Sequence, residues 1–204
     1  MADQFSLAGR HALVTGGARA IGATIATALA QAGAAVVIGD ILDDLGGETA
    51  AGLSAKGAKA GFVHLDVTDE SQWEKAVPAV IKQIGGFDIL INNAGIEVSA
   101  LVADIDVVGL RRMIDVNVVG TLLGMKHAFR AMRPGGAAAK GGSVVNISSV
   151  AATIAFPAIA GYSASKSAVD RMTRVAAILL SAHPRSRQLF LAYAGVASPG
   201  ENRL

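Results

Sequence analysis

Short apolar runs alternate along this chain with longer stretches that have helical spacing, and this alternation constrains the fold more than any other feature. The apolar runs show no polar alternation, which is typical of strands buried on both faces of a parallel sheet. The pattern therefore predicts an α/β fold in which helices cover both faces of one parallel sheet. Strands are expected at 11–15, 34–38, 61–65, 87–91 and 143–147, and helices at about 20–31, 42–55, 68–84, 107–132 and 162–181.

The composition fits a single domain of this kind. The chain has 204 residues, enough to bury a substantial core, and 52% of them are hydrophobic while only 4% are aromatic. Small apolar residues allow helices to pack closely against a sheet. The formal net charge is +2 and no dense Lys/Arg block is present, so we expect no nucleic acid and no membrane surface as partner.

Other residue types narrow the setting further. The chain has no cysteine, which excludes disulfides and thiolate metal sites, and its four histidines show no metal-ligand spacing. The segment Met1–Phe5 lacks the basic start and apolar run of a signal peptide. The uncharged stretch 141–165 is interrupted by Asn146 and Pro157, so it does not read as a membrane span. We expect a cytoplasmic protein without a metal site.

A glycine-rich turn follows the first predicted strand and leads into a helix. It runs Thr15-Gly16-Gly17-Ala18-Arg19-Ala20-Ile21-Gly22. Such a turn lets the backbone approach a pyrophosphate, to which the helix N-terminus presents free N–H groups. The alternative is a tight turn with no ligand.

The charge at the end of the second strand bears on the choice of cofactor. Asp40 can accept both ribose hydroxyls of NAD and would repel the 2′-phosphate of NADP. Arg19 points the other way, because a cation in the turn can meet that phosphate. The Asp40 carboxylate is the stronger indication, because it would lie against the 2′-phosphate of NADP, so the sequence favours NAD. The alternative is that Asp40 is only a solvated carboxylate at a strand end.

Tyr162 and Lys166 lie four residues apart in a predicted helix, so both project from one face. A free tyrosine has a pKa of about 10. An ammonium one turn away favours the phenolate and is expected to lower that pKa, which makes the tyrosine usable as a general acid and base. An exposed tyrosine and lysine without a catalytic role are the alternative.

Six motifs, in order along the chain, resemble those of the short-chain dehydrogenase/reductase family. The glycine turn resembles its cofactor turn, and Asp66-Val67 resembles the pair that receives adenine. The others are Asn92-Asn93-Ala94-Gly95, Asn117, Ser149 and the pair Tyr162 and Lys166. The resemblance covers about Leu7 to Ala177 and implies a Rossmann-like, doubly wound sheet.

The resemblance also implies a reaction, in which a hydride passes between NAD(H) and a secondary alcohol or ketone. Tyr162 would be the general acid and base, Ser149 would bind the substrate oxygen, and Lys166 would also bind the nicotinamide ribose. Asn117 would hold a proton-relaying water, or else it is a buried asparagine bonded to backbone. Ser148 competes with Ser149 for the serine's role. The implied cofactor-binding residues are Gly16, Arg19, Ile21, Gly22, Asp40, Asp66, Val67, Asn93, Tyr162 and Lys166.

The finer identity is less constrained. The stretch 64–68, Trp73 and the segment 124–126 look similar to bacterial hydroxysteroid dehydrogenases of this family, and the family resemblance implies a homo-oligomer. A 3-oxoacyl reductase is the alternative within the enzyme class, and Asp40 counts against it. Glu97, just after the Asn92–Gly95 motif, is expected to be a solvated loop charge, with a position facing the substrate as the alternative.

Two departures from the family pattern stand out. Ala20 occupies the place of the middle glycine of the cofactor turn. Its methyl group near the pyrophosphate predicts a modest penalty for cofactor binding, unless a small shift of the turn accommodates it. After about Ala177 the resemblance stops, so we divide the chain into a domain at 1–181 and a divergent tail at 182–204. We interpret this tail as a frameshift or truncation, because Arg187-Gln188-Leu189 can be encoded so that a frame one base later reads Val-Asn-Ser. The missing strands weaken the expectation of an oligomer.

The tail leaves two outcomes open. The apolar run Leu189–Ala194 can dock as a substitute for the missing sixth strand, which would cover the edge of the fifth. Otherwise the chain is a catalytically impaired, nucleotide-binding remnant.

Overall fold

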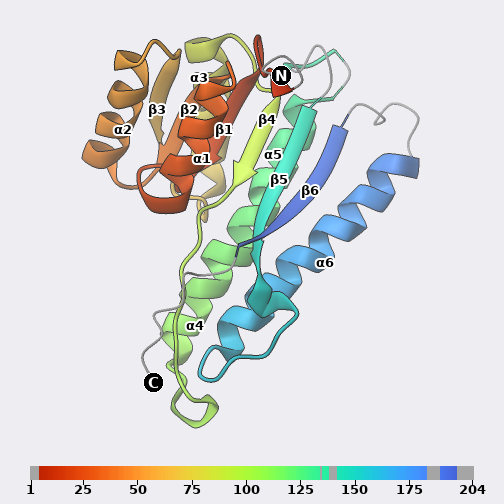
Figure 1. Cartoon of the computed structure of the whole chain (residues 1–204). Coiled ribbons are helices and arrows are strands. Elements are labelled where there is room, and N and C mark those ends of the chain that lie inside the picture. Colours follow the sequence, from red (N-terminus) through yellow and green to blue (C-terminus); the bar gives the residue numbers. More distant parts are fainter. Residues whose placement is uncertain (1–4, 134, 138–141, 183–188, 197–204) are drawn as a thin grey trace.

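A computed structural model describes residues 5–133, 135–137, 142–182 and 189–196, with the backbone course alone for 179–182 and 189–196. It contains one parallel sheet with the strand order β3-β2-β1-β4-β5-β6 (Figure 1). The order reverses direction next to β1, which makes the sheet doubly wound and confirms the predicted fold class. The strands are β1 His11–Thr15, β2 Ala35–Asp40, β3 Ala60–His64, β4 Ile89–Asn92, β5 Gly142–Ser149 and β6 Leu189–Val196.

Helices connect the strands and cover both faces of the sheet. They are α1 Ala20–Gln31, α2 Asp43–Ala55, α3 Glu70–Ile84, α4 Val107–Ile114, α5 Thr121–Ala131 and α6 Ala160–Ala182, with short 3-10 turns at Val102–Asp104 and Val150–Ala152. Helices α1 and α2 pack on one face. Helices α3, α5 and α6 pack on the other.

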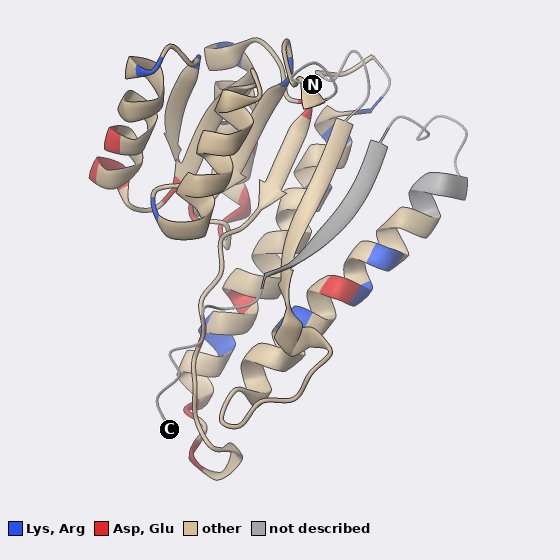
Figure 2. Cartoon of the chain, viewed as in Figure 1, with Lys and Arg blue, Asp and Glu red and all other residues tan. Residues whose placement is uncertain are grey.

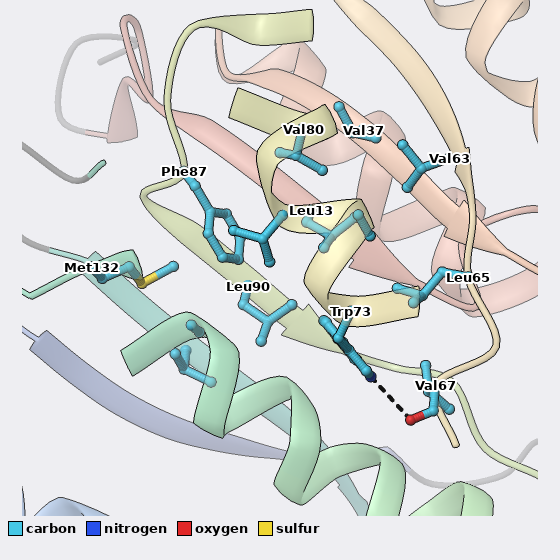
Figure 3. Packing of buried hydrophobic residues seen from close by; sticks show 14 of the residues in the cluster. Leu13, Val37, Val63, Leu65, Val67, Trp73, Val80, Phe87, Leu90 and Met132 are labelled. Atoms are coloured by element: carbon cyan, nitrogen blue, oxygen red, sulfur yellow. Dashed lines mark hydrogen bonds between the residues drawn. The ribbon is translucent and has the colours of Figure 1, made fainter. Parts of the chain in front are cut away.

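The core follows from the two-sided burial of the strands. In β1, Ala12 and Val14 pack toward α1 and α2, while Leu13 packs on the opposite face with Trp73 of α3. Figure 3 shows this second cluster, in which large side chains of α3 fill the space between the sheet and α5. Trp73 and Phe87 are both fully buried there.

The long helix expected at 107–132 is interrupted. Between α4 and α5 the backbone forms a π-helical stretch at Asp115–Gly120. Single π-helical turns within α-helices are frequently found at functional sites. Here the widened turn carries Asn117.

The sheet has a sixth strand, β6, in addition to the five predicted ones. It pairs with β5 in parallel register from Leu189 to Val196. The apolar run at 189–194 therefore does lie at the edge of the sheet, as one of the two expectations for it required. Most of the remaining tail, including Arg187 and Gln188 on which the frameshift interpretation depends, lies outside the described residues.

Candidate active site

A cleft of about 1050 Å³ opens at the carboxyl ends of the strands. In a doubly wound sheet, ligands bind at this edge, where the strand order reverses. All ten residues predicted to bind the cofactor line the cleft: Gly16, Arg19, Ile21, Gly22, Asp40, Asp66, Val67, Asn93, Tyr162 and Lys166. Ser149 and Asn117 are buried beside it.

The glycine turn is held in a conformation that requires small residues. Gly16 has a φ of +61°, and a Cβ on Gly22 would lie 2.1 Å from the carbonyl oxygen of Gly16. The side-chain amide of Asn93 donates hydrogen bonds of 3.0 Å to the carbonyls of Thr15 and Gly16. Asn93 thereby fixes the turn to the end of β4.

Ala20 also strains the backbone of the turn, which is a cost separate from the effect on cofactor binding that its methyl group predicts. Its φ is +48°, in the left-handed region that favours glycine. An L-residue with a Cβ pays about 1–2 kcal/mol for this conformation. The departure from the family pattern therefore has a visible cost in the backbone.

The N-terminus of α1 fits a phosphate group. No side chain caps the helix there, and its first turn contains no acidic residue. Its first residues Ala20, Ile21 and Gly22 all line the cleft. Uncapped N–H groups at a helix N-terminus bind anions.

Asp40 is fixed at the end of β2 by two backbone N–H groups, which donate to its carboxylate from Ala18 at 2.9 Å and from Leu42 at 3.1 Å. Each carboxylate oxygen keeps a further lone pair for a hydroxyl group of a ligand. The carboxylate is thus oriented toward the same cleft as the helix N-terminus.

Asp66 and Val67 form the wall next to Asp40, beyond the end of β3. The Asp66 carboxylate accepts hydrogen bonds from the N–H and the hydroxyl of Thr68 at 2.9 and 2.8 Å. The helix that follows, α3, is capped by Asp69, whose side chain accepts from the N–H of Ser71.

Tyr162 and Lys166 project from the first turns of α6, and both reach the cleft. Burial raises the pKa of Tyr162, while the Ser149 hydroxyl acts in the opposite direction and the Glu97 carboxylate raises it further. Burial lowers the pKa of Lys166 to about 8.

The expectation that Lys166 lowers the pKa of Tyr162 is wrong for this structure. The Lys166 Nζ atom donates to the carbonyl oxygen of Ile147 at 2.8 Å and lies 5.8 Å from the centroid of the Tyr162 ring. The ammonium therefore interacts with β5, and burial of the phenol decides the direction of the shift.

Of the two candidate serines, Ser149 is the one whose hydroxyl lowers the pKa of Tyr162. Its Oγ atom also accepts from the N–H of Ala151 at 3.2 Å. The Ser148 hydroxyl lines the cleft, but it is directed at the carbonyl of Lys166, at 3.3 Å. The geometry therefore favours Ser149 as the partner of the tyrosine.

Asn117 has its side chain committed to the loop after β4. Its amide accepts from the N–H of Ile96 at 2.8 Å and donates to the carbonyl of Ile96 at 2.9 Å and to Ser165 Oγ at 3.0 Å. This is the backbone-bonded arrangement that the sequence left open. It fixes the loop that carries Glu97.

Glu97 is exposed, as expected of a loop charge, yet its side chain also lines the cleft and raises the pKa of Tyr162. Arg111 and Arg112 of α4 also line the cleft and were not predicted. Figure 2 shows charged residues of both signs on the elements around the cleft. A position near the Asn92–Gly95 motif was the only available signal for Glu97, and α4 offered none.

In the described part of the chain, no group of three or more His, Cys, Asp or Glu side chains is arranged to hold a metal ion. None of the helices in that part combines the length and the apolar character needed to cross a bilayer.

Comparison with known proteins matches residues 10–184 to the family model for short chain dehydrogenase. The chain is 41% identical over 194 residues to a trans-4-hydroxycyclohexanecarboxylate dehydrogenase from Sinomonas cyclohexanicum, with 88% of this chain and 73% of that protein covered. It is 40% identical over 174 residues to a 3-alpha-(or 20-beta)-hydroxysteroid dehydrogenase from Mycobacterium bovis, with 85% and 64% covered. The chain thus spans about two thirds of the length of such relatives.

Solved structures show the same fold. A gluconate 5-dehydrogenase from Burkholderia cenocepacia, in complex with NADP and tartrate, superposes with a TM-score of 0.86 at 32% identity, covering 96% of this chain and 74% of that chain. A short-chain alcohol dehydrogenase homologue from Sinorhizobium meliloti has a TM-score of 0.85 at 34% identity, with 95% and 73% covered.

Proposed function

Because the chain belongs to the short-chain dehydrogenase family, we propose that it transfers a hydride between NAD(H) and a secondary alcohol or ketone. The observation that carries this proposal is the meeting of Tyr162, Ser149 and Lys166 at one end of a cleft whose other end holds Asp40 and the uncapped N-terminus of α1. One end suits proton transfer, and the other suits a dinucleotide.

Each end of the cofactor has residues suited to hold it. We assign the pyrophosphate to the turn at Gly16–Gly22 and the adenosine ribose to Asp40. Asp66 and Val67 would then hold the adenine, because β3, which precedes them, is the neighbour of β2. Lys166 would bind the nicotinamide ribose. Bound there, the nicotinamide ring would accept or supply the hydride.

The residues of this chain would move the proton. In oxidation, the ionised Tyr162 oxygen takes the hydroxyl proton of the alcohol while Ser149 holds the substrate oxygen by a hydrogen bond. In reduction, the protonated phenol returns that proton. Asn117 keeps the loop at Ile96 and Glu97 in place beside these groups.

The substrate class follows from the relatives, whose names describe cyclic secondary alcohols: a hydroxycyclohexanecarboxylate, a hydroxysteroid and cyclopentanol. We propose a cyclic secondary alcohol for this protein, with a hydroxysteroid among the compounds to test. NAD is proposed over NADP because of the Asp40 carboxylate, although one structural neighbour binds NADP.

The test is NADH formation from a panel of cyclic secondary alcohols and hydroxysteroids, with NADP⁺ in a parallel series. Tyr162→Phe should remove activity by at least about a hundredfold while NAD still raises the unfolding temperature. Ser163→Ala, a change at the next residue, is the control and should retain activity. Full activity of the phenylalanine variant would refute the role of the tyrosine, and inactivity of folded, NAD-binding protein on the whole panel would refute the proposed reaction.

The raised pKa of Tyr162 adds a pH dependence. Oxidation needs the phenolate and reduction needs the phenol, so the oxidation rate should rise with pH into the alkaline range, whereas the reduction rate should be highest at lower pH. Identical pH profiles in the two directions would contradict the assignment.

A further inference from the structure

Trp73 lies behind the wall of the cleft formed by Asp66 and Val67, and its side chain is fully buried. Its indole Nε1–H donates to the carbonyl oxygen of Val67 at 3.0 Å. Figure 3 shows the indole directed from α3 at that carbonyl. We infer that Trp73 is a positioning residue for the adenosine half of the cofactor site, an inference that rests on the proposed function.

The other anchors of the wall are local hydrogen bonds: the Asp66 carbonyl accepts from the N–H of Asp69 at 3.1 Å, and its carboxylate accepts from Thr68. The wall follows the end of β3, so no strand pairing holds it. The side-chain oxygen of Gln72 accepts from the N–H of Asp66 at 2.7 Å. Neighbouring residues at the start of α3 therefore bind the wall from behind, one at Asp66 and one at Val67.

The opposite side of Val67 is equally constrained. A Cβ on Gly120, in the π-helical turn, would lie 2.6 Å from Val67 Cγ2. Val67 is thus held between that turn and Trp73. A shift of its carbonyl would move the Val67 side chain within the cleft.

Trp73 is itself fixed from the side of α5. The His127 ring stacks on the indole with centroids 6.1 Å apart and planes 9° apart. His127 is 8% exposed, and its Nε2 atom lies 3.3 Å from Glu70 Oε1. Because Glu70 also pairs with Lys126, the start of α3 is joined to α5 around the indole.

These contacts make the wall pre-organised. If the indole N–H is removed, the wall must be ordered when the nucleotide binds, and that ordering weakens binding. The loss of one hydrogen bond of ordinary strength corresponds to about a fivefold rise in Kd. The effect should be confined to ligands that touch the wall, because Tyr162, Ser149 and Lys166 lie on other elements.

The experiment measures binding of AMP and of nicotinamide mononucleotide, the two halves of NAD, to Trp73→Phe by calorimetry. The variant keeps an aromatic ring against His127 but cannot donate the hydrogen bond. We expect a Kd about fivefold higher for AMP and NAD, an unchanged Kd for nicotinamide mononucleotide and an unchanged kcat.

The control is Phe87→Leu, which truncates another fully buried ring of the same cluster, placed away from Val67 in Figure 3. It should lower stability and leave both Kd values unchanged. If Trp73→Phe binds AMP as tightly as the wild type, or weakens both halves equally, the inference is overturned. If the wild type binds neither AMP nor NAD, the proposed function fails with it.

A second measurement needs no variant. Trp73 is the single tryptophan of the chain, so its fluorescence reports on this wall alone. Saturating AMP should leave this emission unchanged, because the wall is already ordered in the free protein. A shift of the emission on AMP binding means that the nucleotide itself orders the wall, and it overturns the inference even if Trp73→Phe does not fold.

Discussion

Replacing Lys166 with methionine should make the protein more stable near neutral pH. The Lys166 side chain is 5% exposed, and burial lowers its pKa from the ordinary 10.5 to about 8. At about 1.4 kcal/mol per pKa unit, keeping the ammonium charged in the folded state costs about 3 kcal/mol at neutral pH. Methionine is similar in length and brings no charge.

The variant also loses a favourable contact. The carbonyl oxygen of Ile147 would no longer accept the 2.8 Å hydrogen bond from Nζ, and an unsatisfied buried acceptor costs about 1–3 kcal/mol. The difference leaves a net stabilisation of about 1 kcal/mol for Lys166→Met at about pH 7. The buried charge outweighs the hydrogen bond.

The pH dependence gives the sharper test. The folded-state pKa of Lys166 lies below its unfolded value, so between about pH 8 and pH 10.5 the unfolded chain binds more protons than the folded one. The stability of the wild type relative to the variant therefore rises with pH across this window. Tyr162 stays protonated below its ordinary pKa because burial raises that pKa, so it contributes little below about pH 9.5.

Urea unfolding at about pH 7 and pH 9.5 measures this difference. We expect Lys166→Met to be more stable at the lower pH and to lose that advantage at the higher one. Lys56→Met, at an exposed lysine that follows α2, is the control, and its difference from the wild type should not change with pH. If the free-energy difference between Lys166→Met and the wild type is the same at both pH values, the reasoning from the buried ammonium is refuted.

Two further substitutions test strain and pairing elsewhere. Ala20→Gly should raise the free energy of unfolding by about 1 kcal/mol, because φ is +48° there. Ala23→Gly, within the same helix, should lower it by about 1 kcal/mol. Equal losses for the two variants in urea unfolding would contradict the strain at Ala20. Asp88→Asn should lower the free energy of unfolding by about 1–3 kcal/mol. The buried Asp88 carboxylate accepts from the N–H of His11 at 3.0 Å and lies 2.5 Å from His11 Nδ1. Asp44→Asn, at an exposed site, should change the stability very little, and equal losses for the two variants would contradict the pairing of Asp88 with His11.

The bounds of β1 and α1 could be predicted to the residue because glycines mark the turn between them and the end of the helix. The turn at Gly16 separates strand from helix, and Gly33, with a φ of +97°, follows the helix end. The break in the helix at Asp115–Gly120 could not be predicted in this way. Its residues continue the helical pattern, and the widened turn follows from contacts with other elements, such as Val67 against Gly120.

The site was predictable in its membership and less so in its geometry. All ten residues predicted to bind the cofactor line the cleft, because eight of them lie at or just after the carboxyl ends of β1 to β4 and the other two, Tyr162 and Lys166, lie near the start of α6. The direction of the Lys166 ammonium was not predictable. Four-residue spacing puts Nζ and the phenol on one face, but the nearest acceptor, the Ile147 carbonyl, belongs to a strand that only the fold brings there.

The asparagines of the motifs form structural hydrogen bonds around the few residues that are proposed to react. Asn92 donates to Asn146 Oδ1 at 2.7 Å, Asn93 binds the turn after β1, and Asn117 binds the loop at Ile96. An amide offers both donors and an acceptor, so one side chain can satisfy backbone groups at strand ends that have no ladder partner. Throughout the described residues, every buried side-chain nitrogen and oxygen has a hydrogen-bond partner. These amides therefore join β4 to β5 and to the turn after β1, and the π-helical turn to the loop at Ile96, and so hold together the edge of the sheet at which Tyr162 and Lys166 line the cleft.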